Sequence, residues 1–317
     1  MHLIFPLSFP GLLCYNQAMD KLKIKAYAKL NLTLKILGQR PDGYHDIDSV
    51  FHCISLHDEL TLSSRRDGRI VLKCNDPKLP TDDSNLAYRA ALTLRNLALK
   101  RHPAKKTFGA TITLKKNIPI GAGLGGGSSD AAAVLLGLKK LWHLEEMSPA
   151  DLKKAAASLG SDVPFFLKGG TAHVTGRGEK VRARRCPREY HFVLVYPGFP
   201  VSTAWAYKNH KKTKNRLTKG HKFSKILLKS CGLGKAAVDI SRHLINDLEP
   251  AVIPRHPRIS RVKADLLKAG ALGSMMSGSG SSVFGLFPDA ASAEKGYSKI
   301  SKIWPGSFLA HSVSSGK

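Results

Sequence analysis

The sequence predicts an α+β protein that folds as two domains. Segments with the period of a β-strand and segments with the period of an α-helix are mixed in both halves of the chain. They do not alternate regularly, as the units of a doubly wound parallel sheet would. The 317 residues are enough for two domains, and the basic, turn-rich stretch 177–187 is the expected connection between them.

The first domain is expected to span residues 19–184. Apolar alternation predicts strands at 23–37, 50–60, 69–74, 110–115 and 171–174, and helical spacing predicts helices at 85–100, 128–142 and 148–159. Leu86, Ala90 and Leu94 share one face of the first helix. The third has a well-formed start, with Pro149 at the first helical position and Asp151 in the first turn.

The second domain is expected to span residues 185–310. The pattern predicts strands at 191–196 and 283–287 and helices at 246–249 and 259–269. Residues 1–18 carry no lysine or arginine, and two prolines interrupt their apolar run. A secretory signal needs a basic start and an unbroken apolar core, so we expect a disordered extension there.

The composition is that of a soluble globular protein, with 43% hydrophobic and 23% charged residues. No apolar run is long enough to cross a bilayer, so no membrane partner is expected. The five cysteines are scattered and show no CxxC spacing, which argues against a disulfide framework or a zinc site. This cysteine usage favours a reducing, cytoplasmic location.

Positive charge is in large excess, because 50 lysines and arginines face 23 aspartates and glutamates, a net charge of +27. Such a charge attracts nucleotides, phosphorylated substrates and other polyanions. Much of it lies in the stretch 208–235, which has no acidic residue and one aromatic residue, Phe223. A single-strand nucleic-acid surface would interleave more aromatic rings with the charges. We therefore interpret the stretch as a solvated basic loop and expect no specific nucleic-acid partner.

A glycine-rich loop at 119–130 is the most specific feature of the chain. Glycine has no Cβ, so such a loop brings its N–H groups close to an anion, and the N-terminus of the following helix adds more. A Walker loop would end in Gly-Lys, whereas Gly127 is followed by Ser128. A dinucleotide fold needs an acidic residue after the next strand, but Glu145 and Glu146 lie at a predicted helix end. The loop therefore indicates a phosphate site of another kind.

Three other segments are candidate partners of this loop. Lys29 lies in an otherwise apolar strand, and Asn31 faces the same side two residues later. Asp162 follows the predicted helix at 148–159, and a carboxylate at a helix C-terminus is unfavourable without another role. The third segment is a second glycine–serine loop at 277–282.

Together these segments resemble the GHMP kinase superfamily, from about residue 23 to about residue 287. The matching motifs are Ala-Lys-Leu-Asn-Leu at 28–32, the glycine loop at 119–129, Gly-Ser-Asp-Val-Pro-Phe at 160–165 and Ser-Gly-Ser-Gly at 277–280. Gly-Gln-Arg-Pro-Asp-Gly-Tyr-His at 38–45 is similar to a branch whose acceptor is a cytidine diphosphate conjugate. A general phosphate site would not require this last motif.

The resemblance implies an N-terminal domain like domain 2 of ribosomal protein S5, a ferredoxin-like C-terminal domain, and a small-molecule substrate that meets ATP and Mg²⁺ between them. Asp162 would be the catalytic base, and Lys29 would offset charge on the phosphoryl group. Tyr44 and His45 would bind the cytidine part, Asn31 the sugar-like part, and Thr203 and Tyr207 the cytosine. The ATP-binding residues would be Pro119, Ile120, Gly121, Ala122, Gly123, Leu124, Gly125, Gly126, Gly127, Ser128 and Ser129.

Two alternatives stay open at this stage. The chain is a GHMP kinase for homoserine, mevalonate or a sugar, against which Tyr44 and His45 argue because those acceptors carry no base. Or it is a basic nucleic-acid-binding protein on an S5-like fold, whose binding would fall steeply with salt. The sequence names no metal ligand beyond one serine of Ser128 and Ser129, and it allows a monomer or a homodimer.

Overall fold

The computed structural model describes residues 21–103, 108–210 and 221–314. The extension expected at 1–18 lies outside these residues. So do residues 211–220 of the basic stretch. The strands are β1 (Lys21–Gln39), β2 (His45–Arg65), β3 (Ile70–Cys74), β4 (Gly109–Lys115), β5 (Thr171–Gly176), β6 (Lys180–Arg184), β7 (His191–Val195), β8 (Ile245–Asn246), β9 (Gly273–Met276), β10 (Val283–Phe287) and β11 (Ser307–His311). The helices are α1 (Leu86–Arg101), α2 (Gly126–Leu141), α3 (Pro149–Leu159), α4 (Val163–Phe166), α5 (Thr203–Lys208), α6 (His221–Gly232), α7 (Ala237–Ser241), α8 (Glu249–Val252), α9 (Arg258–Lys268) and α10 (Ala290–Ile300).

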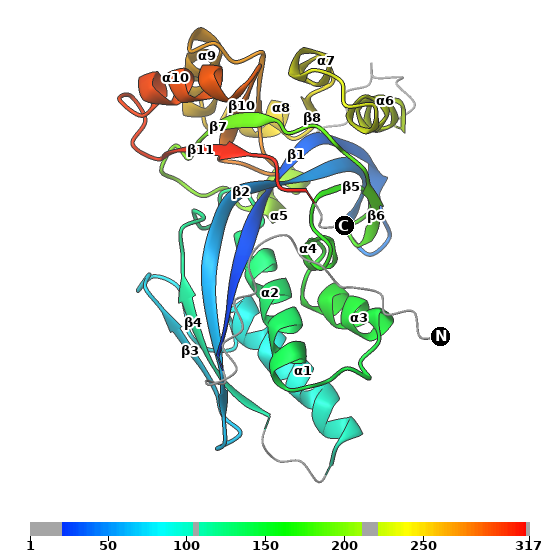
Figure 1. Cartoon of the computed structure of the whole chain (residues 1–317). Helices are drawn as coiled ribbons and strands as arrows, with labels where there is room; N and C mark the ends of the chain where they lie inside the picture. Colours follow the sequence, from blue (N-terminus) through cyan, green and yellow to red (C-terminus); the bar gives the residue numbers. More distant parts are fainter. Residues whose placement is uncertain (1–20, 104–107, 211–220, 315–317) are drawn as a thin grey trace.

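The long antiparallel pair β1–β2 forms the centre of the first sheet, whose order is β3-β4-β2-β1-β8, with β5 and β6 joined to β2. Helices α1, α2 and α3 gather on one side of this sheet (Figure 1). Helix α2 presents Gly137 to the sheet, where a Cβ would collide with the side chains of Ile24 of β1 and Leu62 of β2. Glycine therefore lets the helix approach the sheet closely.

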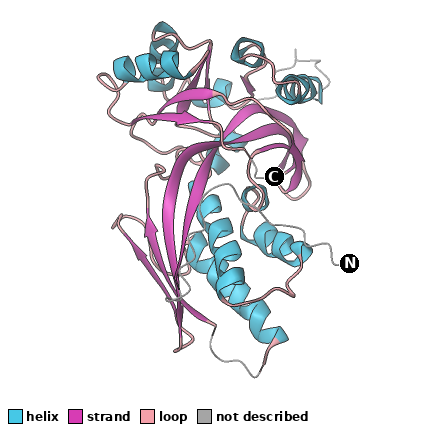
Figure 2. Cartoon of the chain, viewed as in Figure 1, coloured by secondary structure: helices cyan, strands magenta, loops and turns pink. Residues whose placement is uncertain are grey.

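The second sheet has the order β11-β7-β10-β9 and is antiparallel throughout. Its strands therefore lie in the spatial order fourth, first, third, second, with α9 and α10 as the two crossing helices, which is the ferredoxin-like arrangement. Phe192 and Leu194 pack in one cluster with Leu30 of β1. Val193 and Val195, on the opposite face, pack with residues of α9 and α10. Strands and helices are mixed in both halves (Figure 2), which confirms the α+β prediction.

The short strand β8 ties the two halves together, because it comes from the C-terminal half and pairs in parallel with β1 of the first sheet. Directly after it, Asp247 accepts a hydrogen bond from the Lys35 ammonium at 2.8 Å and from the N–H of Ile36 at 3.0 Å. Both side chains of this ion pair are almost fully buried. The first sheet is therefore completed by residues distant in sequence.

Several boundaries differ from the prediction. The segment 246–249 is wrong as a helix, because Asn246 is in β8 and the helix begins at Glu249. The predicted connection 177–187 contains β6, which pairs with β5 inside the first sheet. Helix α2 begins at Gly126, two residues before the expected start, because Gly125 caps it in a left-handed conformation. Hydrogen bonds to neighbouring strands decide the positions of β8 and β6, and the local pattern does not show these bonds.

Candidate active site

A single large cavity of about 1360 Å³ brings the predicted motifs together. Both halves of the chain line it, since β1, the glycine loop and Asp162 come from the first half and α5 and the 277–282 loop from the second. The predicted site residues that line it are Lys29, Asn31, Tyr44, His45, Pro119, Ile120, Gly121, Ala122, Gly123, Leu124, Gly125, Gly126, Gly127, Ser128, Asp162, Thr203 and Tyr207. Ser129 is the exception, because it is buried in α2 and does not line the cavity.

The glycine loop takes a backbone path that requires glycine. Gly121, Gly123 and Gly125 have φ values of +66°, +77° and +72°, a region that residues with a Cβ rarely adopt. A Cβ on Gly125 would lie 2.8 Å from Phe166 and 3.2 Å from Lys29. The loop thus lies directly against the end of α4, the short helix that follows Asp162, and against the predicted catalytic lysine.

The second glycine–serine loop holds the first in place. The Ser277 hydroxyl donates to the carbonyl oxygen of Gly123 at 3.0 Å, and the N–H of Ser282 donates to that of Ala122 at 3.1 Å. The loop then leads into the first turn of α2, where Gly126, Gly127 and Ser128 supply N–H groups that have no partner within the helix. This geometry suits an anion, as the sequence predicted.

Lys29 and Asp162 meet in the cavity, with 3.6 Å between Nζ and Oδ2. The ammonium also donates to Oδ1 of Asn31, whose amide donates to Ser49 at 3.0 Å. Burial lowers the pKa of Lys29, and the Asp162 carboxylate opposes this effect only in part. The amino group of Lys29 is therefore held in a poorly solvated place by one carboxylate and one amide.

The local setting of Asp162 corrects one expectation. Helix α3 ends at Leu159, and Asp162 is the N-cap residue of α4, so its carboxylate does not stand against the negative end of a helix. A carboxylate at a helix N-terminus is favourable. Proline at the second helical position, Pro164, and the buried Phe165 and Phe166 anchor α4 behind it. The short helix thereby fixes the carboxylate at the edge of the cavity.

An aromatic group lies at another part of the same cavity. The rings of His45 and Tyr207 are 5.4 Å apart between centroids, whereas Tyr44 is 53% exposed and lies under the guanidinium of Arg177 at 4.9 Å. Burial is the main cause that raises the pKa of Tyr207, so its hydroxyl is un-ionised. The Thr203 hydroxyl pairs with that of Ser279 at 2.9 Å. Flat rings with polar edges suit a nucleobase.

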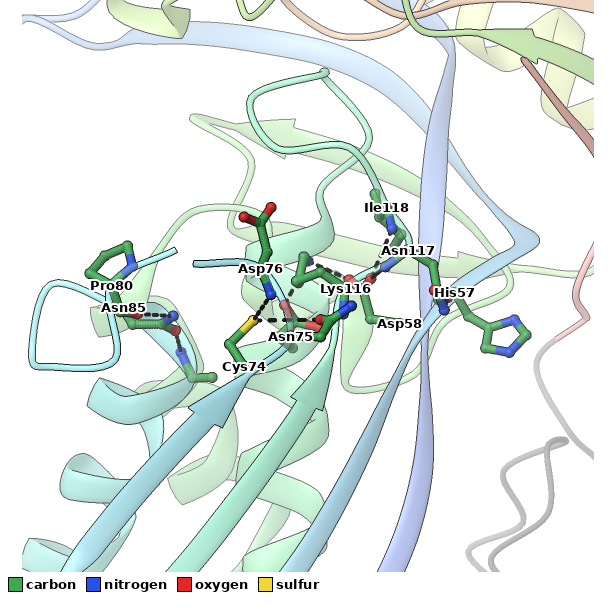
Figure 3. A network of polar contacts seen from close by, with 12 residues as sticks. His57, Asp58, Cys74, Asn75, Asp76, Pro80, Asn85, Lys116, Asn117 and Ile118 are labelled. Carbon is green, nitrogen blue, oxygen red and sulfur yellow. Dashed lines mark hydrogen bonds and ion pairs between the residues drawn. The ribbon is translucent and has the colours of Figure 1, made fainter. Parts of the chain in front are cut away.

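The structure also shows a buried polar network that the sequence did not reveal. Lys116, at the end of β4, pairs with Asp58 of β2 and with Asp130 of α2, the latter at 2.9 Å. Oδ1 of Asp58 accepts the N–H groups of Asn117 at 2.6 Å and Ile118 at 2.8 Å, so one carboxylate holds the entry to the glycine loop (Figure 3). The three charged residues are almost fully buried.

The Lys116 ammonium lies next to the first residue of α2. It lines the cavity, and a Cβ on Gly126 would lie 3.1 Å from its Nζ. Burial alone would lower the pKa of Lys116, but Asp130 and Asp58 outweigh it, so the pKa is raised. Burial raises the pKa of Asp130. The sequence did not indicate this contact. Lys116 precedes Asp130 by fourteen residues, and the two meet only when the glycine loop between them is folded.

The sequence also gave no indication of a second wall of the cavity, formed by residues 79–86. Leu79, Pro80, Ser84, Asn85 and Leu86 line it beside the glycine loop. Asn85 caps α1 by accepting the N–H of Ala87 at 2.9 Å, and its amide donates to the carbonyl of Pro80 at 2.8 Å. The turn before α1 is thus held firmly against the cavity (Figure 3). Turn residues of this kind carry no pattern that distinguishes a site from an ordinary loop.

No metal cluster is preformed in the described part of the chain, where no group of three or more His, Cys, Asp and Glu side chains is placed to hold an ion. Asp48 and His52 of β2 are buried, and their hydrogen-bond partners include His173 and Thr171 respectively. Among the helices in the described ranges, none is long and apolar enough to span a membrane.

Family comparisons agree with the architecture. The family model described as the GHMP kinases N terminal domain matches residues 85–170, and the one described as GHMP kinases C terminal matches residues 227–306. A 4-diphosphocytidyl-2-C-methyl-D-erythritol kinase of Pelotomaculum thermopropionicum is 45% identical over 271 residues, which cover 85% of this chain and 90% of the relative. A kinase of the same name from Nostoc sp. is 40% identical and covers 92% and 94%.

Solved structures place the fold in the same group. A crystal structure of 4-(cytidine 5'-diphospho)-2C-methyl-D-erythritol kinase has a TM-score of 0.72 at 32% identity, covering 91% of this chain and 98% of the other. Homoserine kinase from Cytophaga hutchinsonii has a TM-score of 0.74 at 22% identity, covering 96% and 98%. The similar TM-scores therefore do not distinguish the two kinds of kinase. The sequence identities, 32% and 22%, do distinguish them.

Proposed function

Since the chain belongs to the GHMP kinase family, and within it to the 4-diphosphocytidyl-2-C-methyl-D-erythritol kinases, we propose that it transfers a phosphoryl group from ATP to the 2-hydroxyl of 4-diphosphocytidyl-2-C-methyl-D-erythritol. The products would be the 2-phosphate and ADP, in the non-mevalonate route to isoprenoids. One observation carries the proposal most directly: the Lys29–Asp162 pair, the glycine loop and the His45–Tyr207 rings line one cavity.

In this proposal Asp162 accepts the proton of the acceptor hydroxyl. It is a surface-accessible carboxylate, 31% exposed, at the edge of the cavity, so a hydroxyl can reach it. The neighbouring ammonium of Lys29 offsets the negative charge of the transferring group. Phosphoryl transfer depends mainly on position and charge stabilisation, which fixed groups of this kind supply.

The N–H groups of the glycine loop and of the first turn of α2 would hold the ATP phosphates, with Lys116 as a second cation beneath them. The buried carboxylates of Asp58 and Asp130 keep this ammonium in one place. In this network the acidic side chains of Asp58 and Asp130 face the single ammonium of Lys116. The network therefore holds no excess positive charge before ATP binds. The phosphates would therefore be attracted chiefly by the N–H groups of the backbone and by Lys29, and Lys116 would mainly position the loop.

The acceptor would lie along the other wall. We propose that Tyr44, His45 and Tyr207 bind the cytosine, that Thr203 helps to orient it, and that Asn31 contacts the methylerythritol part near Lys29. A histidine ring can donate and accept hydrogen bonds at a cytosine edge. The closeness of His45 to Tyr207 supports a shared base site.

Mg²⁺ is the metal that we propose to accompany ATP. It prefers oxygen ligands and keeps several waters, so few protein ligands are needed. The residues fit this requirement: the Ser128 hydroxyl is at the cavity wall, and Oδ1 of Asp130 is a buried oxygen without a hydrogen-bond partner among the described residues. When bound, the ion would neutralise phosphate charge. We also propose a cytoplasmic location, where Cys53, Cys74 and the other thiols of the described chain stay unpaired.

The test is ADP release by the purified protein with ATP and Mg²⁺. The cytidyl substrate, homoserine, mevalonate and galactose are offered in turn at equal concentrations. We expect turnover with the cytidyl substrate and at least 100-fold less with the others, as expected where buried polar groups would be left unpaired. Activity confined to one of the other three acceptors would overturn the assignment and favour the homoserine, mevalonate or sugar kinase alternative.

A further inference from the structure

Arg177 is a cationic residue of the cavity to which neither the sequence motifs nor the proposed mechanism gives a role. It lies in the turn between β5 and β6 and lines the cavity. Its guanidinium carbon is 4.9 Å from the centroid of the Tyr44 ring. The side chain is partly buried, so the charge is at the cavity wall and not in bulk solvent.

The same turn also touches the catalytic end of the cavity. A Cβ on the next residue, Gly178, would lie 3.1 Å from the Cβ of Ser161 and 3.4 Å from Oδ1 of Asp162. Gly178 has a φ of +122°, so the tight turn that allows this approach favours glycine. Arg177 therefore stands between Tyr44, on the nucleoside side, and Asp162, where phosphoryl transfer is proposed.

The guanidinium is available to an anion. Within the described ranges, no carboxylate lies at ion-pair distance from it, although Arg177 is near enough to Asp42 to be one of the causes that lower the pKa of that carboxyl. The nearest acidic residue in sequence, Glu179, accepts the backbone N–H of Arg177 at 2.8 Å. The carboxylate of Asp42, in the turn after β1, already accepts hydrogen bonds from the Arg40 guanidinium at 3.2 Å. Arginine presents a planar set of donors that matches phosphate oxygens in pairs.

We propose that Arg177 binds the diphosphate of the acceptor substrate. This inference rests on the proposed function, in which the acceptor has a cytosine at one end and the reacting hydroxyl at the other. The diphosphate joins these two ends, and Arg177 is a cavity cation whose turn contacts the groups proposed to bind both, whereas Lys208, another cavity cation, directly follows Tyr207 on the base side. Arg177 is thus a specificity residue, because acceptors without a diphosphate gain nothing from it.

Two other roles make different predictions. If Arg177 only supports the Tyr44 ring, its removal weakens every ligand that stacks there, whether or not it carries phosphate. If it contacts the phosphates of ATP, its removal raises the KM for ATP. A diphosphate site weakens only ligands of the acceptor class that carry the diphosphate.

The experiment compares Arg177→Met with Arg182→Met. Arg182 lies on the neighbouring strand β6, is exposed and does not line the cavity, so the control makes the same change in net charge. Inhibition constants of cytidine diphosphate and of cytidine are measured against the cytidyl substrate, together with the KM values of both substrates. Arg177→Lys tests whether one charge without the planar fork suffices.

For Arg177→Met we expect the inhibition constant of cytidine diphosphate and the KM of the acceptor to rise about 10- to 100-fold, as for the loss of charge-assisted hydrogen bonds. The constants for cytidine and ATP should stay within about 2-fold of wild type, Arg177→Lys should recover part of the loss, and Arg182→Met should match wild type. Equal losses for cytidine and its diphosphate, or a loss confined to ATP, would overturn the diphosphate site while leaving the proposed function intact. A wild-type protein that does not phosphorylate the cytidyl substrate would overturn both.

Discussion

The carbonyl oxygen of Ser277 occupies the space that a side chain on Gly123 would need. The two residues belong to different halves of the chain, and the hydroxyl of one donates to the carbonyl of the other. The two glycine–serine loops are therefore interlocked, and the path of the phosphate loop depends on residues far away in the sequence.

We predict that Gly123→Ala abolishes most ATP binding and destabilises the protein by about 2–4 kcal/mol, from the left-handed φ together with the steric overlap. Gly38→Ala is the matched control, because a Cβ there meets nothing within 4 Å. ATP titration calorimetry and urea unfolding measure the two effects. A Gly123→Ala protein with wild-type ATP affinity would mean that the loops separate easily.

Asp162→Asn is expected to lower kcat by about 100- to 10,000-fold, because the amide cannot accept the hydroxyl proton. Lys29→Met should lower kcat by about 100- to 1,000-fold through the loss of charge stabilisation. The KM of ATP should change little in Asp162→Asn, since the loop N–H groups remain. Steady-state ADP release measures both parameters. Wild-type kcat in Asp162→Asn would remove this carboxylate from the chemistry.

Lys29 also predicts the alkaline side of the pH profile. Because burial lowers its pKa, the ammonium loses its proton below pH 10.5, the usual value for lysine. We expect kcat to fall with rising pH before pH 10.5 is reached, and Lys29→Arg, which stays charged, to shift this fall upward. Rate measurements across pH 7–11 with both proteins check the shift. An unchanged alkaline limb would assign it to another group.

Asp58→Asn tests the network beneath the glycine loop. The substitution removes the charge that Lys116 shares and weakens the hold on two backbone N–H groups, so we expect a loss of about 2–4 kcal/mol in the free energy of unfolding and a several-fold higher KM for ATP. Asp67→Asn, which breaks ion pairs in an exposed turn, should leave both quantities near wild type. Urea unfolding and ATP kinetics measure these quantities. Equal unfolding free energies and equal KM values in the two variants would contradict a supporting role for the buried Asp58.

His52 predicts how stability depends on pH. Burial lowers its pKa from 6.5 to about 4, so the folded state holds the ring neutral while the unfolded state takes up a proton. The resulting stability is complete above pH 6.5 and is lost as pH falls toward 4, by up to about 3 kcal/mol. Between pH 7 and 4, His52→Gln should therefore lose less stability than wild type. His311→Gln, in an exposed position, should follow the wild-type curve.

The sequence predicted the residues that line the site better than the buried residues that hold them in position. Lys29, Asp162 and the glycine loop could be found because each has an unusual local setting: a lysine in an apolar strand, an aspartate between helices, and clustered glycines. The structure places them in one cavity, and their roles stay predictions. The comparisons confirm the family that the motifs indicated.

The remaining features depend on tertiary contacts. Nothing near Asp58 or Lys116 indicates that they meet, since β2 and β4 must first pair and α2 must pack on them. Asn246 has a helix-like setting in the sequence but joins the first sheet, because β1 has a free edge there. The individual roles of Tyr44, Thr203 and Arg177 stay predictions, which binding measurements decide.

The buried pair Lys35–Asp247 has a consequence for cutting the chain. A fragment that ends near residue 184 would keep Lys35 in its strand but lose the carboxylate and the strand β8 that cover it. An ammonium stranded in this way costs several kcal/mol. The two halves are thus interdependent in folding, and a calorimetric scan should show one cooperative melting event in place of two independent ones.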